Sequence, residues 1–575
     1  MDNRDISTRF EEIASLLEMQ GEDPFRIRAY RRAAETIKRL PDSLRVRVQQ
    51  QTLEELPGIG KTLAREITEL VQTGHLRYYD HLKSTVPQGL LPLLRLSSLS
   101  TEQIRLLWRK HDVTSMKQLA QLHRQGELPF DEATVTAIGR DIESWNRNQN
   151  RMLLGMALPR AELLMQNLQR FPLVERVCIA GSIRRGVDLV ADMNLVLASP
   201  DPPRLIEMCT RQHEVRQVLH ASEHFARILT SEGLRVTFTA VPPADFVPAL
   251  FHATGSAAHL TVLRRLAQQQ GLQLTEHGLT RLRDGSDIEL PHEEAIYNHL
   301  GLPYIVPELR ENMGEIEVAT SGHLKPVLSA QDVLGDLHVH SNWGNGAHSI
   351  EDIAQAAQRM GYQYMAICDY TFSPETGQGL TAAELSKQII AIRQLNAQLP
   401  PTFKLLAGAE VEITPEGDLT IDDDVLQELD IVVAAMHTGY KAPREQITRR
   451  LCKAMEHPLV NVLAHPSGRM LGRQDIPSID MEAVLETAVD TSTCLEINSH
   501  VLRLDLKDQH VRQAKDLGIM LTLGSDAHSV QEMRTMRLGI HTARRGWLEA
   551  RQLLNALPYT ALIRHLQNRD AIHAI

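Results

Sequence analysis

Hydrophobic and polar positions change their spacing along this chain of 575 residues. In residues 1–150, apolar side chains recur at helical spacing within short segments broken by turns, as in Phe25–Leu40. From about Val174, β-rich runs such as Asn194–Ala198 alternate with helical stretches. The pattern predicts an α-helical N-terminal part followed by an α/β part.

A third pattern follows a polar connection that contains Gly and Pro, at about Glu311–Gln331. From Asp336 onward, short apolar runs recur between helical segments, at Tyr364–Ile367, Lys404–Ala407, Ile431–Ala435, Val460–Leu463, Cys494–Ile497 and Met520–Leu523. Strands that alternate with helices form parallel βαβ units, and so many units in series predict a barrel.

Composition limits the class of protein. The length predicts about three to five domains, and 43% hydrophobic with 23% charged residues is typical of a globular protein. We expect a cytoplasmic protein without membrane segments, because the N-terminus is polar and no apolar run approaches the roughly 20 residues that span a bilayer. The five cysteines are scattered without a CxxC pair, which suggests reduced thiols.

The net charge of −11 argues against a wholly basic nucleic-acid binder. The first 150 residues are nearly neutral, so the acidic excess lies in the rest of the chain. An acidic C-terminal part suits a cation site as well as it suits solubility, and charge alone does not decide between them.

In the region from Asp336 onward, histidine, aspartate and glutamate residues lie almost entirely at the C-terminal ends of the predicted strands. They are Asp336, His338, His340, Asp369, Glu410, His437, His465, Asp526 and His528. In a barrel of parallel strands these ends converge on one mouth. A single histidine there is more often an ordinary surface or core residue, but so many together predict a metal site. Imidazole and carboxylate ligands suit zinc, manganese or iron.

From about Gly335 to Asn568 the sequence resembles the polymerase-and-histidinol-phosphatase (PHP) domain, in the form fused to bacterial family X DNA polymerases. The resemblance includes His465–Arg469, Leu495–Asn498 and Ala543–Trp547. It implies a distorted (β/α)7 barrel that holds metals through nine ligands.

The resemblance also implies which residues hold each metal. The first metal would take His338, His340, Glu410 and Asp526, and the second would take Glu410, His437 and His465. The third would take Asn345, Tyr370 and His528, where the family has Asp, His and His. An amide is a weak ligand and a phenol must first lose a proton, at a pKa of about 10. We therefore expect two ions, Mn or Zn, and a third site that is empty or weak.

Two ions suffice for hydrolysis of a phosphodiester, so Glu410, His338 and His340 are the candidate catalytic residues. Arg469 and Arg503 are candidates for holding the phosphate, although either could equally form a surface ion pair. Asp336, Glu496 and Asn498 are expected to support the ligands.

The segment Gly181–Gly186, followed by Asp192–Asn194, resembles the nucleotidyltransferase motif of family X polymerases. That chemistry needs three carboxylates that hold two magnesium ions. Here only Asp192 remains, because the second position is Asn194 and the third is Thr237.

Other acidic residues nearby do not replace the two missing carboxylates of the triad. Asp188 would lie roughly 13 Å from Asp192 along an extended strand, Glu232 would face the opposite side, and Asp245 follows two prolines. We expect polymerase activity to be lost or weak, with Mg bound only if it persists. A nucleotide pocket is still predicted from six positions that match the family: Gly181, Ser182, Arg184, Thr254, Gly255 and Ser256.

The segment Leu56–Lys61 resembles a helix-hairpin-helix, in which Gly58, Gly60 and Lys61 would contact DNA phosphates without reading sequence. The second hairpin, Leu96–Ser100, lacks glycine. Glu66 stands where related lyase domains have a lysine nucleophile, which argues against lyase activity.

The resulting prediction is a multidomain DNA-repair protein. Residues 1–150 would form the helical DNA-binding part, 151–318 the nucleotidyltransferase-like palm and thumb, 319–334 a linker and 335–575 the PHP domain. The barrel would hydrolyse DNA 3′ ends, and the expected partners are gapped or 3′-end DNA and nucleotides. The protein is expected to be a monomer. An active gap-filling polymerase, a small-molecule phosphatase and a non-enzymatic DNA-binding scaffold remain the alternatives.

Overall fold

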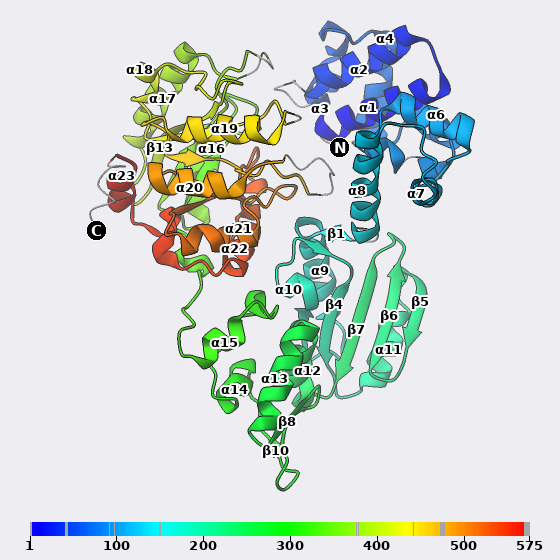
Figure 1. The fold of residues 1–575 in the computed structure, drawn as a ribbon, viewed down its shortest axis with the longest axis vertical. Coiled ribbons are helices and arrows are strands. Elements are labelled where there is room, and N and C mark those ends of the chain that lie inside the picture. The colour runs from blue at the N-terminus through cyan, green and yellow to red at the C-terminus, as the bar shows by residue number, and fades with distance from the viewer. Residues whose placement is uncertain are drawn as a thin grey trace.

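The computed structural model describes residues 3–38, 40, 44–90, 92–96, 98–148, 151–374, 377, 379–440, 442–471 and 478–567. Figure 1 shows a helical N-terminal part, a middle part built on a sheet, and a C-terminal part in which helices surround a barrel. No helix among the described residues is long and apolar enough to cross a membrane.

The N-terminal part is entirely helical in its described residues. Its elements are α1 (Asn3–Gln20), α2 (Pro24–Lys38), α3 (Leu44–Gln50), η1 (Leu53–Glu55), α4 (Lys61–Thr73), α5 (Arg77–Ser84), η2 (Gln88–Leu90), η3 (Leu93–Arg95), α6 (Thr101–His111), α7 (Met116–Gln125) and α8 (Glu132–Asn148). One apolar core joins these helices, and α8 leads from them to the sheet of the middle part (Figure 1).

The middle part contains a five-stranded sheet in the order β2-β4-β7-β6-β5. Its elements are β1 (Met152–Leu153), α9 (Leu154–Leu168), β2 (Arg176–Ala180), α10 (Gly181–Arg184), β3 (Leu189–Val190), β4 (Met193–Ala198), α11 (Pro202–Thr210), β5 (Val215–Ala221), β6 (Phe225–Thr230), β7 (Arg235–Val241), η4 (Pro243–Asp245) and α12 (Phe246–Thr254). Strands β4 and β7 run parallel, and this register pairs Asn194 with Thr237.

A smaller unit follows, which we call the thumb. It comprises α13 (Ala257–Gln269), β8 (Leu272–Thr275), β9 (Gly278–Arg281), β10 (Asp287–Ile288), α14 (Glu293–His299), η5 (Pro307–Leu309) and α15 (Glu315–Thr320). The predicted linker, 319–334, starts inside α15 and contains η6 (Ala330–Asp332). Its backbone is fixed to the barrel, because the N–H groups of Leu328 and Leu334 donate to the carbonyls of Leu548 and Asn555.

The C-terminal part is a seven-stranded parallel sheet in sequence order, from β11 to β17. A parallel bridge between Val339 and Ala527 brings its two edges together, as in a barrel. The strands are β11 (Gly335–Val339), β12 (Tyr364–Ile367), β13 (Lys404–Glu412), β14 (Ile431–Ala435), β15 (Val462–Leu463), β16 (Cys494–Asn498) and β17 (Leu521–Gly524). The predicted strand-helix alternation and parallel order are therefore both present.

The barrel helices are α16 (Ile350–Arg359), α17 (Ala382–Asn396), α18 (Asp423–Leu426), α19 (Arg444–Met455), α20 (Met481–Thr491), α21 (Asp508–Asp516), η7 (Glu532–Thr535), α22 (Met536–Arg545), η8 (Ala550–Gln552), η9 (Leu554–Ala556) and α23 (Tyr559–Gln567). Almost every strand residue is buried, since helices cover the outside and side chains fill the inside.

The barrel packs against the middle part and the thumb through apolar and charged contacts. Leu504 and Leu538 of the barrel belong to the core under the five-stranded sheet. Glu308 of the thumb accepts a hydrogen bond from His541 Nδ1 at 3.0 Å and lies 2.8 Å from Arg544 Nε. These contacts bury ionised groups, so each partner depends on the other.

Burial alone would raise the pKa of Glu308, but His541 and Arg544 outweigh burial and lower this pKa to about 2. A depressed carboxyl pKa stabilises the folded state above the unfolded pKa of about 4.3, and that stability is lost as the pH falls towards 2. We expect Glu308→Gln to reduce stability by about 3 kcal/mol at pH 7, with the difference shrinking below pH 4.5. Calorimetric unfolding from pH 7 to pH 3 measures this. Glu207→Gln, which breaks an exposed pair with Arg211, is the control and should change little.

Candidate metal centre and polymerase site

Two groups of metal-binding side chains share one carboxylate at the mouth of the barrel. The first group is His338, His340, Glu410 and Asp526, and the second is Glu410, His437 and His465. Within each group the candidate ligand atoms all lie within 4.8 Å of one another. Atoms bound to a single zinc-sized ion at about 2.0–2.2 Å must lie within about 4.4 Å of each other, so the donor sets fit metal ions after small adjustments.

Glu410 presents a different oxygen to each group. Its Oε2 atom lies 3.1 Å from His338 Nε2 and 3.4 Å from His340 Nε2. Its Oε1 atom lies 3.1 Å from the Nε2 atoms of both His437 and His465. This is the geometry that a carboxylate needs to bridge two neighbouring ions.

Strand ends and backbone conformation direct these ligands inward. Glu410 lies in β13, and His338 lies in β11 with His340 directly after it. His465 and Asp526 both have positive φ, at 31° and 55°. Non-glycine residues in this conformation are uncommon, and such strain collects at functional sites.

The electrostatics of the centre favour a bound cation. Burial would raise the pKa of Glu410 and Asp526, but the neighbouring histidines lower both pKa values well below the usual range. Two ionised carboxylates are therefore held in a buried site. Burial would lower the pKa of His437, but Glu410 and Glu412 outweigh burial and raise this pKa to about 9. Nε2 of His437 lies 3.1 Å from Glu410 Oε1, and a metal ion bound there would replace the proton that this carboxylate attracts.

Further carboxylates hold the histidine rings. Glu496 Oε1 lies 2.7 Å from His338 Nδ1, and its Oε2 accepts the backbone N–H of His465 at 2.8 Å. Asp336 accepts the backbone N–H of His338 at 3.2 Å. Asn498 donates to Asp526 at 3.1 Å. Hydrogen bonds of this kind fix the tautomer and direction of a ligating imidazole.

Glu412 is a supporting residue that the sequence analysis missed. Its Oε2 atom lies 2.6 Å from His437 Nδ1, and Arg450 lies 3.3 Å from its Oε1. The signal was present, because Glu412 follows Glu410 by two residues on β13 and side chains two apart on a strand point the same way.

We expect Glu412→Gln to weaken metal binding at the second group about 10- to 100-fold, because an amide can present its N–H to His437 Nδ1 and so favour the wrong tautomer. Titration of metal-free protein with Mn²⁺ measures the dissociation constants. Glu416→Gln, an exposed acid beyond the same strand, is the matched control. Identical affinities for both variants would contradict the assignment of Glu412.

The two candidate phosphate-binding arginines differ in place. Arg503 has its Nε 3.7 Å from Asp526 Oδ2, beside the metal groups. Arg469 is buried and forms an ion pair with Asp188 of the middle part at 3.0 Å, while it also donates to the carbonyl of Leu504. Arg469 thus joins the two parts of the chain through the ion pair that was its alternative role, and phosphate binding by either arginine remains a prediction.

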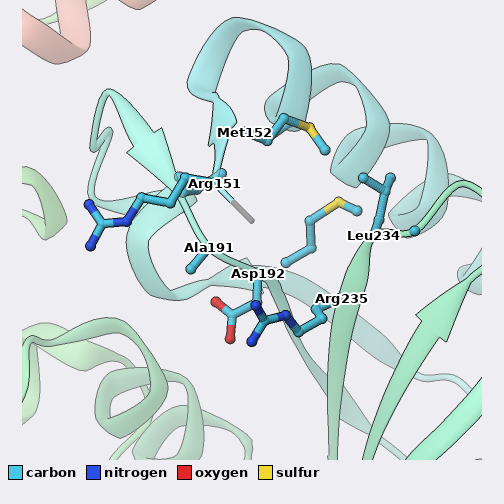
Figure 2. Close-up of a pocket in the computed structure, with 10 residues that line it drawn as sticks. Arg151, Met152, Ala191, Asp192, Leu234 and Arg235 are labelled. Atoms are coloured by element: carbon cyan, nitrogen blue, oxygen red, sulfur yellow. The ribbon is translucent and has the colours of Figure 1, made fainter. Parts of the chain in front are cut away.

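The structure brings the three predicted triad positions, Asp192, Asn194 and Thr237, close together. Asn194 donates to Asp192 Oδ1 at 2.9 Å, and Arg227 donates to Thr237 Oγ1 at 3.5 Å. A cavity of about 150 Å³ lies beside these positions, and Asp192, Arg151 and Arg235 help to line it (Figure 2). Neutral or basic groups now stand where a magnesium site needs carboxylates.

The other acids do not complete this site in the structure. Asp188 is paired with Arg469. Glu232 is exposed and lies 3.5 Å from Arg160. The sequence-based argument against a rescued triad is consistent with these positions.

The positions predicted to bind a nucleotide lie together around α10. Gly181 has φ +64°, and the Asn194 side chain would be 2.6 Å from a Cβ at this position. Arg184 donates to Thr254 Oγ1 at 2.8 Å and forms two hydrogen bonds with Glu293 of the thumb. Ser256 caps α13. The guanidinium group of Arg184, which is predicted to bind a nucleotide, is thus paired with the carboxylate of Glu293.

Comparison with known proteins gives three family matches along the chain. The helix-hairpin-helix domain model matches residues 1–76, the DNA polymerase beta thumb model matches 249–311 and the PHP domain model matches 336–500. DNA polymerase/3′-5′ exonuclease PolX of Bacillus subtilis is 33% identical over 562 residues, which cover 97% of this chain and 98% of that protein. The chain belongs to the PolX family of DNA polymerases.

More distant relatives match only parts of the chain. DNA polymerase lambda of Rattus norvegicus is 25% identical over 341 residues, or 54% of this chain and 56% of that protein. A probable phosphatase of Syntrophotalea carbinolica is 28% identical over 237 residues, or 40% of this chain and 93% of that protein. The predicted fold class, with its helix-hairpin-helix, polymerase and PHP parts, is confirmed. These PolX domains imply divalent metal cofactors and DNA binding.

Two of the three residues predicted for a third metal site, Tyr370 and His528, have rings that stack against His340. Asn345 is exposed, and Tyr370 and His528 approach each other only at 3.5 Å. The ring of His340 stacks on both of them, with centroids 4.5 and 4.2 Å apart. His528 lies outside both metal groups of the described residues. The expectation of a weak or empty third site remains a prediction.

In the helix-hairpin-helix of this PolX chain, the N-terminus of α4 is accessible to a ligand. Gly58 has φ +80°, which favours glycine, and Gly60 precedes α4 with free space around it. Lys61 begins the helix and is exposed. Glu66, in contrast, is buried and accepts a hydrogen bond from Tyr30 at 2.8 Å. A buried carboxylic acid cannot form the Schiff base of a lyase.

Proposed function

We propose that the PHP barrel of this PolX family member hydrolyses 3′ ends of DNA with two divalent ions, Mn or Zn. The observation that carries this proposal is Glu410, whose two oxygens face two separate groups of ligands. The PolX relative of Bacillus subtilis is named as a 3′-5′ exonuclease. Hydrolysis of a DNA end is therefore the function that the geometry supports best.

Each side chain has a definite task in this proposal. Bound ions would lower the pKa of a coordinated water and neutralise the attacked phosphate. His338, His340 and Asp526 would hold one ion. His437 and His465 would hold the other ion, and Glu410 would bind both ions. Glu496 and Glu412 orient the imidazole rings, and Arg503 can hold a phosphate oxygen of the substrate.

We further propose that the polymerase activity is lost or weak, and that the middle part serves to hold DNA. Asp192 is the one carboxylate left at the triad positions, and magnesium would bind there only in an active enzyme. Gly58, Gly60 and Lys61 would contact the DNA backbone near a gap. Nucleotide binding at Gly181–Arg184, a monomeric state and cytoplasmic localisation belong to the same proposal.

The likeness to probable phosphatases favours a second candidate, a small-molecule phosphatase. One assay separates the candidates. Purified protein is loaded with Mn²⁺ and given a gapped duplex, a duplex with a 3′-phosphate, or a sugar phosphate. The proposal expects release of 3′ nucleotides or phosphate from DNA at least tenfold faster than sugar phosphate hydrolysis. Faster hydrolysis of the sugar phosphate would overturn it.

A further inference from the structure

Two exposed aromatic side chains stand at the mouth of the barrel. Among the phenylalanine, tyrosine and tryptophan side chains that the structure describes, the exposed ones are Phe25 at 75%, and Trp343 and Phe372 at 39% each. Trp343 lies in the loop after β11, and Phe372 in the loop after β12. These strands are neighbours in the barrel, so both residues belong to adjacent loops beside the metal groups.

The aromatic character continues inward to the candidate ligands. Tyr370 and Phe372 are two residues apart, and the residues on either side of Phe372 are buried. In this extended segment Tyr370 and Phe372 therefore project to the same side. Tyr370 stacks on His340 with an interplanar angle of 23° and meets His437 edge-on at 5.0 Å. Tyr370 thus contacts a histidine of each metal group, and Phe372 lies two residues beyond it towards the surface.

The two loops are fixed to each other. Asp369 accepts hydrogen bonds from the backbone N–H of Ser341 at 2.7 Å and from its hydroxyl at 2.5 Å. Gln388 donates to the same carboxylate at 2.6 Å. A Cβ at Gly344 would lie 2.9 Å from Asp369, so the loop that carries Trp343 packs closely against it. A rigid aromatic surface loses little freedom when a ligand binds.

We propose that Trp343 and Phe372 bind the bases of a single-stranded DNA 3′ end by stacking, and thereby bring its terminal phosphodiester to Glu410. This inference rests on the proposed function and specifies its substrate as an unpaired end. Bases stack on exposed aromatic rings without regard to sequence. Arg503 lies 3.7 Å from Asp526 of the first metal group, and this arginine and the metal groups suit the backbone phosphates. The loops that carry Trp343 and Phe372 follow neighbouring strands of the same barrel mouth, so bases and phosphates of one strand can be bound together.

The predicted weakness of the third metal site supports the same conclusion. Its predicted positions include Asn345 and Tyr370, which lie in these two loops. A metal ion at these positions would bind a phosphate, whereas the neutral amide of Asn345 and the ring of Tyr370 favour contact with a base.

The test compares two oligothymidylates of equal length and charge, one normal and one with abasic residues at its three 3′ positions. For the wild-type protein with Mn²⁺, we expect the KM of the normal strand to be about tenfold lower. In Trp343→Ala/Phe372→Ala the two KM values should become equal, and Trp343→Phe should restore most of the difference. Ile390→Ala, an exposed apolar residue of α17, is the matched control and should keep the full difference. An undiminished difference in the double variant would overturn the inference.

Tryptophan fluorescence tests the inference independently of hydrolysis. In metal-free protein, the normal oligothymidylate should quench part of the fluorescence, the abasic strand should not, and Trp343→Phe should abolish the effect. If no strand is hydrolysed but this base-dependent quenching occurs, the proposed function fails and the base site stands. If hydrolysis occurs and quenching is absent or survives in Trp343→Phe, the base site fails alone.

Discussion

Glu410→Gln should reduce hydrolysis of DNA 3′ ends roughly 1,000-fold, which corresponds to about 4 kcal/mol of transition-state stabilisation by bound metal. The reason is that one carboxylate serves both groups, with Oε2 facing His338 and Oε1 facing His437. An amide removes the negative charge and offers a single neutral oxygen as a ligand. Both ions should then bind weakly.

Metal analysis and steady-state kinetics on the same preparation measure this effect. The wild type should retain two ions per chain after gel filtration, and Glu410→Gln fewer than one. Glu428→Gln, which changes an exposed acid on the way from α18 to β14, is the control and should retain both ions. Full hydrolysis by Glu410→Gln would show that the activity resides elsewhere in the chain or in a contaminant.

Asn194→Asp combined with Thr237→Asp should create magnesium-dependent nucleotide incorporation where the wild type shows little, with a gain of at least 100-fold. The parallel pairing of β4 with β7 places positions 194 and 237 side by side, and Asp192 is two residues from position 194. Three carboxylates would then surround one space, as two-metal phosphoryl transfer requires. Asn and Asp have the same shape, so the close approach to Gly181 need not change.

Primer extension on a gapped template measures the gain, and each single variant is a control. Asn194→Asp alone should stay near the wild-type rate because position 237 still lacks a carboxylate. Arg227 lies 3.5 Å from Thr237 and would pair with a new carboxylate there, so adding Arg227→Ala should raise incorporation further. Efficient incorporation by the unmodified protein would instead show that Asp192 suffices.

The sequence predicted the barrel because its strands are fully buried and separated by helices, which produces regular apolar runs. The ligand groups could also be predicted, since parallel strands bring their C-terminal ends together whatever the lengths of the connections. His338, Glu410 and His465 come from three different strands, and the structure places them within one site.

Contacts between distant parts of the chain could not be predicted in this way. Arg469 follows a strand end as a mouth residue would, but Asp188, 281 residues earlier, holds it by an ion pair. Glu293 of the thumb likewise forms an ion pair with Arg184 of the middle part. Such pairings depend on how whole units pack, and the spacing of residues along one strand carries no information about that. Glu412 is different, because its position two residues after Glu410 on β13 is enough to predict that it faces the same side.

The contact between the barrel and the middle part has a practical consequence for protein production. A fragment that begins at residue 335 would keep all seven strands but would expose Leu504 and Leu538 to water. It would also leave Arg469 without Asp188, the carboxylate that neutralises it. Exposed apolar patches of this kind promote self-association. The barrel should therefore be purified with the middle part attached, because the middle part covers these apolar side chains and pairs with Arg469.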